Sequence, residues 1–268
     1  MSPMRAAKRN FFAGLVALAS ALAQSFHVAS PLVEEFRLIA GEVASSQVVL
    51  VNNTDAPLVV RLSQGDYRLR PGGAEFLPPG THPRSNASWI TLSQAEVTLP
   101  PGGQVAVSYQ IRMPQDSKLS GTYFGVIFVE GAEPEPQAPG EALVGIAIAQ
   151  RLRYAVQVLV NVADTGEPKI AFPKARLVSG EKETTLEVEV SNSGDRYIRP
   201  MVRLELFRED GSAVTSLQEG PITLPPDSAT LLRISLPKLA PGTYQAALVL
   251  DGGGAFVFGK RYRFSLKE

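Results

Sequence analysis

The stretch that decides the fold is VVLVNNTDAPLVVRL, which runs from Val48 to Leu62. It has the pattern of a strand, an Asn-rich turn and a second strand. An LPP turn at residues 99–101 and a GTY triplet at residues 121–123 follow it. The same signals return in the same order, as VEVSNSGDRYI (188–198), LPP (224–226) and GTY (242–244). An antiparallel module that occurs twice favours a tandem binding protein over a single catalytic domain.

The remainder of the chain after residue 30 is also strand and turn. Apolar side chains fall at every second position in VAVSYQI (105–111) and TLEVEV (185–190), which is the period of a half-buried strand. Gly- and Pro-rich turns separate the strands, and no later stretch has the spacing of an amphipathic helix. We predict an all-β chain with two tandem immunoglobulin-like β-sandwich domains, residues 24–163 and 164–268, divided at the polar stretch ADTGEP (163–168).

The first 23 residues have the pattern of a Sec-type signal peptide. Arg5, Lys8 and Arg9 precede an apolar run from Phe11 to Ala23 that ends in Ala-Leu-Ala. This run is shorter than the roughly 18–20 residues that span a bilayer. We therefore expect an exported, periplasmic protein without a membrane anchor.

Composition argues against several classes of function. There is no cysteine, so thiol catalysis, cysteine-ligated metal and disulfides are excluded. The 26 basic and 26 acidic residues cancel, so no overall field favours nucleic acid. Neither histidine, His27 or His82, has neighbours at the spacing of a triad or a metal site. We expect that the chain is not an enzyme and uses no metal or cofactor.

One apolar segment, from Ala142 to Val158, has the pattern of a binding strand. One face carries the branched residues Val144, Ile146 and Ile148, and the other carries small residues followed by Arg151 and Arg153. If the small face lies against its own sandwich, the branched side chains point outwards. A protein keeps such an exposed strand when another chain must pair with it. The alternative is a strand that is buried on both faces.

Several motifs resemble those of the periplasmic pilus chaperones of the PapD-like type. They occur in the family's order and cover most of the chain after residue 23. They are FRLI (36–39) with Gly41, VLVNN (49–53) through PLVV (57–60), LPPG (99–102), MPQD (113–116), the apolar strand from Val144 to Arg153, and VSNS (190–193) with Tyr197-Ile198. The segment from Asp66 to Asn86 is long relative to this family.

The resemblance implies a mechanism without ATP or cofactor. Arg37 and Arg153 would lie in the cleft between the domains and bind the C-terminal carboxylate of a pilus subunit. Val144, Ile146 and Ile148 would form a donor strand that fills the groove of that subunit. An outer-membrane usher is a further implied partner, and self-association through the donor strand is another. The alternative is an exported structural or adhesive tandem module that binds cell wall or a partner protein.

Overall fold

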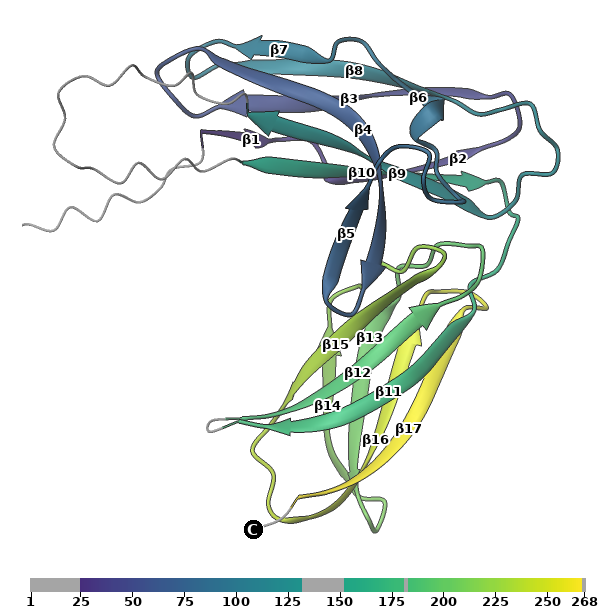
Figure 1. Cartoon of the computed structure of the whole chain (residues 1–268). Coiled ribbons are helices and arrows are strands. Elements are labelled where there is room, and N and C mark those ends of the chain that lie inside the picture. The colour runs from purple at the N-terminus through teal and green to yellow at the C-terminus, as the bar shows by residue number, and fades with distance from the viewer. Residues whose placement is uncertain (1–24, 132–151, 181–182, 267–268) are drawn as a thin grey trace, which may run out of the picture.

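The computed structural model describes residues 25–131, 152–180 and 183–266. It contains two β-sandwiches in tandem (Figure 1), so the predicted all-β fold with two immunoglobulin-like domains is confirmed. Within these ranges the single helical element is a short 3₁₀ helix, η1 (Ala87–Trp89). No helix in the described ranges is long and apolar enough to cross a membrane.

The first domain is built from two sheets that face each other. One has the strand order β1 (Phe26–Val28), β3 (Val43–Asn52), β8 (Gln104–Arg112) and β6 (Ile90–Leu92). The other has the order β2 (Val33–Leu38), β10 (Arg153–Val162), β9 (Thr122–Gly131), β4 (Leu58–Arg70) and β5 (Gly73–Leu77), and β7 (Glu96–Leu99) pairs with β4. The sheets enclose one apolar core, to which β8 contributes Val107, Tyr109 and Ile111.

The second domain has the same layered architecture with fewer strands. One sheet consists of β11 (Ile170–Ser179), β12 (Thr184–Asn192) and β15 (Ser228–Leu236). The other consists of β14 (Ala213–Glu219), β13 (Met201–Arg208), β16 (Gly242–Asp251) and β17 (Val257–Leu266). A separate core lies between these sheets. The connection from the first domain runs between Val162 and Ile170.

The sequence repeat has a physical basis in two buried asparagines. The Asn52 side chain donates to the carbonyl oxygens of Ala56 (2.8 Å) and Leu99 (3.3 Å). Asn192 donates in the same way to Arg196 (2.8 Å) and Leu224 (3.1 Å). Each Oδ1 also accepts from the backbone amide two residues further on, at 2.9 Å and 3.0 Å. In each domain one asparagine therefore joins the strand–turn–strand unit to the LPP turn.

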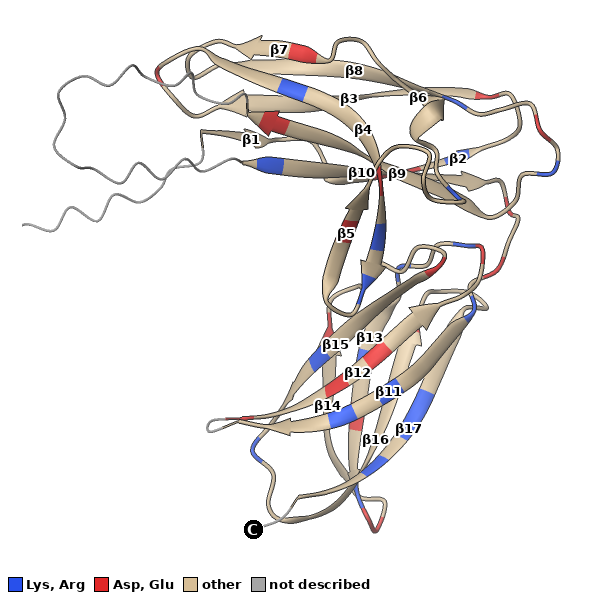
Figure 2. Cartoon of the chain, viewed as in Figure 1, with Lys and Arg blue, Asp and Glu red and all other residues tan. Residues whose placement is uncertain are grey.

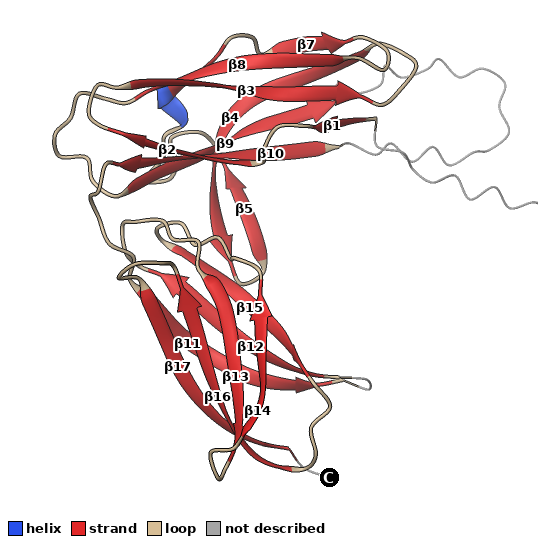
Figure 3. Ribbon diagram, turned by 180° about the vertical axis from the view of Figure 1, so that it is seen from behind, coloured by secondary structure: helices blue, strands red, loops and turns tan. Residues whose placement is uncertain are grey.

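The two sandwiches meet at an angle, and the molecule is bent (Figures 1 and 3). The hairpin of β4 and β5 projects from the first domain towards the second, where β4 contacts β15. This hairpin belongs to the long segment that begins at Asp66. It brings residues of the first domain against the second and so shapes the region in which the candidate site lies.

Candidate functional site

Among the described residues, β10 has strand neighbours on both sides over only part of its length. Strand β2 runs parallel to β10 and pairs with it only from Gln157 to Val162. From Arg153 to Val156, β9 is the one strand that pairs with β10 among the described residues. A strand that has a strand neighbour on one side is the arrangement that an added strand can extend.

The two faces of β10 are arranged opposite to the expectation from sequence. Val156, Val158 and Val160 are fully buried in the core of the first domain. Arg153 belongs to the odd-numbered face, which lies on the outside of this sheet. The face with Arg153 thus does not lie against its own sandwich, because the even-numbered residues point across to the second sheet.

The expected donor residues Val144, Ile146 and Ile148 lie outside the described residues.

Arg153 is held by an acidic and an aromatic neighbour at this edge. Its Nε lies 2.6 Å from Glu130 Oε1, which is opposite it on β9. The guanidinium carbon lies 3.6 Å from the ring centre of Phe128 and 5.6 Å from that of Phe76, an arrangement that stabilises the cation. A shallow cavity of about 260 Å³ lies beside these side chains. The Arg153 side chain is 43% exposed, and a guanidinium has five N–H donors, so it can bind a further carboxylate.

Arg37 lies far from Arg153. It is on β2 opposite Asn161, eight positions further along β10, and it forms an ion pair with Asp164. At roughly 3.3 Å per residue, the two backbone positions are about 26 Å apart. The joint carboxylate clamp expected from the sequence is therefore wrong, because the parallel register of β2 and β10 places the two arginines at opposite ends of one strand.

The outer face of this sheet carries an apolar cluster that the sequence analysis missed. Tyr67, Phe124 and Leu159 are buried members from the first domain, and Tyr197 of the second domain packs against them. The Tyr67 hydroxyl donates to Gln157 Oε1 (2.9 Å), and burial raises the pKa of Tyr67. One sequence signal was present, since FGVIFV (124–129) is apolar on both faces of its strand.

The domain junction is made of close backbone contacts. The Thr122 amide donates to the Asp195 carbonyl oxygen (2.8 Å), and the Tyr197 amide donates to Thr122 Oγ1 (2.9 Å). Gly121 has a φ of +72°, and a Cβ on it would lie 2.0 Å from the same carbonyl oxygen. A glycine is therefore required at residue 121 for the domains to approach this closely.

Asp195 also joins the two domains through its side chain. Oδ1 accepts from the Glu167 amide (2.8 Å), and Oδ2 lies 3.6 Å from an Nη of Arg84 in the first domain. Burial by itself would raise the pKa of Asp195. The Glu167 hydrogen bond and the Arg84 charge outweigh burial and hold this pKa below its ordinary value, so the carboxylate is ionised at neutral pH.

A cavity of about 680 Å³ lies between the domains next to this junction. Its wall includes the loop of His82, Pro83 and Arg84 from the first domain and Pro226 and Asp227 from the second. Both the basic and the acidic side chains that line it come from loops. The sequence analysis gave His82 no function, because its partners in the fold are distant along the chain.

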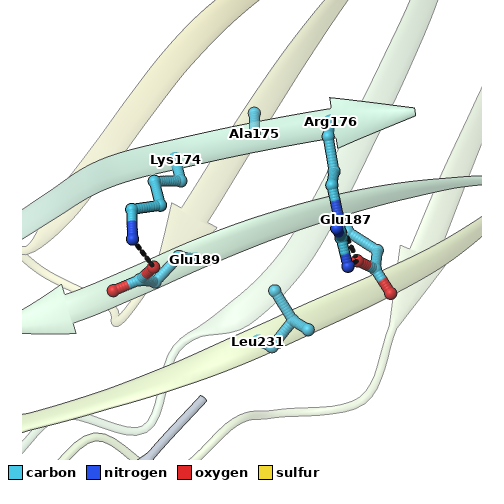
Figure 4. A pocket seen from close by; sticks show the side chains of 6 residues that line it. All are labelled: Lys174, Ala175, Arg176, Glu187, Glu189 and Leu231. Carbon is cyan, nitrogen blue, oxygen red and sulfur yellow. Dashed lines mark hydrogen bonds and ion pairs between the residues drawn. The ribbon is translucent and has the colours of Figure 1, made fainter. Parts of the chain in front are cut away.

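A further hollow of about 380 Å³ lies on the sheet of β11, β12 and β15 in the second domain. In Figure 4, Arg176 lies over Glu187, and Lys174 reaches Glu189. Arg233 contacts Glu187 from the next strand at 3.1 Å. These pairs form a cross-strand charge network.

Figure 2 shows acidic and basic residues interspersed over both domains. In the described part of the chain no cluster of three metal-binding side chains is present.

No family model and no curated protein sequence matches the chain. Among solved structures, a chaperone–tip adhesin complex of CFA/I fimbriae matches with 11% identity and a TM-score of 0.46, over 89% of this chain and 98% of that chain. The chain is similar in fold to fimbrial chaperones.

Two further complexes are of the same kind. A chaperone–tip subunit complex of the Csu pili of Acinetobacter baumannii matches at 10% identity and a TM-score of 0.46, covering 89% of this chain and 98% of that chain. A pilin–chaperone complex of Salmonella enterica matches with 13% sequence identity and a TM-score of 0.41. The match covers 90% of this chain and 96% of that chain. The similarity concerns the fold, so the function has to be inferred from the residues themselves.

Proposed function

We propose that this protein is a periplasmic chaperone for subunits of pili or other surface fibres, and that it acts by strand addition without ATP or cofactor. The observation that carries the proposal is the stretch of β10 from Arg153 to Val156, which β2 does not reach and which has β9 as its one strand neighbour among the described residues. A strand with a strand neighbour on one side is a template for a second chain. The apolar, branched segment from Val144 to Ile148 leads directly into this strand.

In the proposed mechanism Val144, Ile146 and Ile148 complete the core of an unfinished subunit. Backbone hydrogen bonds along the β10 edge hold the subunit strand, and the branched side chains enter alternate pockets of its groove. Covering that groove prevents aggregation of the subunit before assembly. No step in this mechanism requires catalysis.

Arg153 is the proposed contact for an acidic group of the subunit. It lies at the start of the stretch of β10 that β2 does not reach, and its side chain is 43% exposed. Arg37 is about 26 Å away and is paired with Asp164. The carboxylate-binding role is therefore assigned to Arg153 alone.

The proposal also covers export and assembly. Residues 1–23 would direct the chain to the periplasm and be removed there. The subunit would then pass to an outer-membrane usher. Strand addition at the stretch of β10 that β2 does not reach would also allow two copies of the free protein to pair through their donor strands until a subunit displaces one of them.

The decisive experiment compares Ile146→Asp with Ala147→Asp. Both substitutions introduce one carboxylate into the same segment, but only the first changes the face with the large side chains. We expect Ile146→Asp to abolish the recovery of an exported fibre subunit in a pull-down, with an unchanged unfolding curve. With Ala147→Asp, most of the subunit should still be recovered in the pull-down.

An opposite result would favour the structural or adhesive module. In that protein the segment is buried, so Ile146→Asp would place an unpaired carboxylate in the core and unfold the first domain, at a cost of several kcal/mol. Recovery of cell-wall fragments in place of a subunit would point the same way.

A further inference from the structure

His82 is buried at the contact between the two domains, and its neighbours fix its protonation state. The side chain is 1% exposed. Nδ1 accepts a hydrogen bond from the Arg84 amide (3.1 Å), so in the neutral ring the proton is on Nε2. The His82 amide donates to Asp66 Oδ2 (2.8 Å), and the ring packs on Phe124 with 4.7 Å between ring centres. The loop is therefore held in one conformation by the neutral imidazole.

The Nε2 side of the ring faces the second domain. Asp227 Oδ2 lies 3.9 Å from Nε2, and Nε2 has no hydrogen-bond partner in the described part of the chain. Asp227 has a φ of +52° and follows the LPP turn of the second domain. The distance is too long for a direct hydrogen bond, so the neutral ring faces the Asp227 carboxylate without bonding to it.

The next residues of the same loop make a second contact to that domain. Arg84 donates to the carbonyl oxygen of Ser120 (2.8 Å) and lies 3.6 Å from Asp195 Oδ2. Its guanidinium carbon also lies 5.4 Å from the ring centre of Tyr123. The conformation of the loop around His82 thus controls two interdomain contacts, one at Asp227 and one at Asp195.

We propose that this loop is a proton-sensitive latch between the domains: protonation of His82 releases the loop, and the angle between the two sandwiches then becomes less restricted. A protonated imidazole carries hydrogen on both nitrogens. Nδ1 would then confront the Arg84 amide as a second donor, and one of the two groups must move. The inference concerns the domain contact and does not depend on the proposed function.

The charges around the ring decide the direction of the effect. Burial lowers the pKa of His82, and Arg68 and Arg70 on β4 lower it as well. Asp227 and Asp66 raise it but do not compensate, since Asp227 is 64% exposed to water and Asp66 is already bonded to the loop. The folded-state pKa is below the ordinary value of 6.5. The latch is therefore intact above pH 6.5 and is lost as the pH falls through the folded-state pKa.

The chain has no cysteine, so two spin labels can be placed selectively. Ser93→Cys in the first domain and Ser216→Cys in the second are exposed positions. We would measure the distance between the labels from about pH 8 to about pH 5, for three histidine backgrounds. These are the unchanged protein, His82→Asn and His27→Asn, the last affecting the chain's one other histidine. Asparagine at residue 82 can still accept from the Arg84 amide but does not titrate.

We expect the distance distribution to broaden at low pH in the unchanged protein and in His27→Asn, and to stay constant in His82→Asn. A broadening in His82→Asn as large as in the unchanged protein would overturn the proposal. If His82→Asn does not fold, the His27→Asn protein contains His82 as its one histidine. Its imidazole titration by NMR must then have the same midpoint as the distance change, and two different midpoints would also overturn the proposal.

Discussion

At the scale of single residues, two asparagines carry the repeated architecture. Asn52 and Asn192 are each 1% exposed, and each satisfies backbone groups of two turns that are distant in sequence. A buried carbonyl oxygen without a donor costs free energy comparable to a lost hydrogen bond. Each asparagine amide donates to two backbone carbonyl oxygens, so neither carbonyl is left without a donor.

Replacing either asparagine with alanine should destabilise the domain that contains it. We expect Asn52→Ala to lower the free energy of unfolding of the first domain by about 2 kcal/mol, because buried carbonyl oxygens lose their donor. Asn192→Ala should do the same to the second domain. Urea unfolding followed by Trp89 fluorescence reports the first domain. Asn53→Ala, at an exposed position next to Asn52, is the control, and a loss as large as that of Asn52→Ala would contradict the assignment.

The charge network of the second domain makes its stability depend on pH. Hydrogen bonds from Arg176 and then Arg233 hold the pKa of Glu187 below its ordinary value of 4.5. A carboxylate whose pKa is lowered by folding stabilises the fold above its unfolded-state pKa, and this contribution is lost as the pH falls through the folded-state pKa. The second domain should therefore become less stable in acid.

We expect Glu187→Gln to be less stable than the unchanged protein at neutral pH, and the difference to shrink as the pH falls below 4.5. Denaturant unfolding of both proteins over this range measures the difference. Glu219→Gln makes the same change of charge in the same domain at an exposed position. A difference between Glu187→Gln and the unchanged protein that is constant with pH would be inconsistent with the lowered pKa.

At the scale of secondary-structure elements, the hairpin of β4 and β5 packs the first domain against the second. It lengthens β4 beyond Gly65, carries Tyr67 into the cluster with Tyr197, and places β4 against β15. Phe76 on β5 packs edge-on against Phe128 at 5.2 Å between ring centres. The hairpin therefore covers much of the outer face of the β10 sheet.

The turn into β9 is the second element that sets the domain contact. Gly121→Ala should open the junction, because the new Cβ would lie 2.0 Å from the Asp195 carbonyl oxygen. We expect a loss in the free energy of unfolding about 2 kcal/mol larger than that of Gly211→Ala. Gly211 also has a positive φ, +84°, but no atom within 4 Å of the added carbon.

Comparison of the two alanine variants separates steric conflict from backbone strain. Each variant is destabilised by roughly 1–2 kcal/mol, because alanine must adopt a left-handed backbone conformation there. In addition, the new side chain of Gly121→Ala collides with the other domain. Equal losses in denaturant unfolding would show that the junction tolerates a wider separation than the structure has.

At the scale of the whole molecule, β10 separates two positions that the sequence suggested as one site. Arg153 is at the start of β10, which β2 does not reach, and Arg37 is near the connection between the domains. Groups about 26 Å apart can contact one extended partner chain but cannot share one carboxylate.

The substitutions Arg37→Ala and Arg153→Ala should therefore act independently on subunit binding. We expect Arg153→Ala to weaken binding about tenfold or more, as for the loss of a charge-assisted contact, and Arg37→Ala to have little effect. In the double variant the binding free energies should add to within about 0.5 kcal/mol. A coupling energy well above this value, measured by titration calorimetry, would restore the joint clamp.

The sequence by itself determined the fold class and the repeat. Alternating residues such as those of β8, the LPP and Asn-rich turns, and the glycine before Thr122 are local signals, because turn geometry and the two-residue period of a strand depend on neighbours in the chain. The tertiary structure alone decided which face of β10 is buried, over which residues β2 pairs with it, how far Arg37 lies from Arg153, and that His82 lies next to Asp227. These features depend on strand register and on contacts between the domains. A local pattern does not specify which distant strand becomes a neighbour, so they emerge only when the chain has folded.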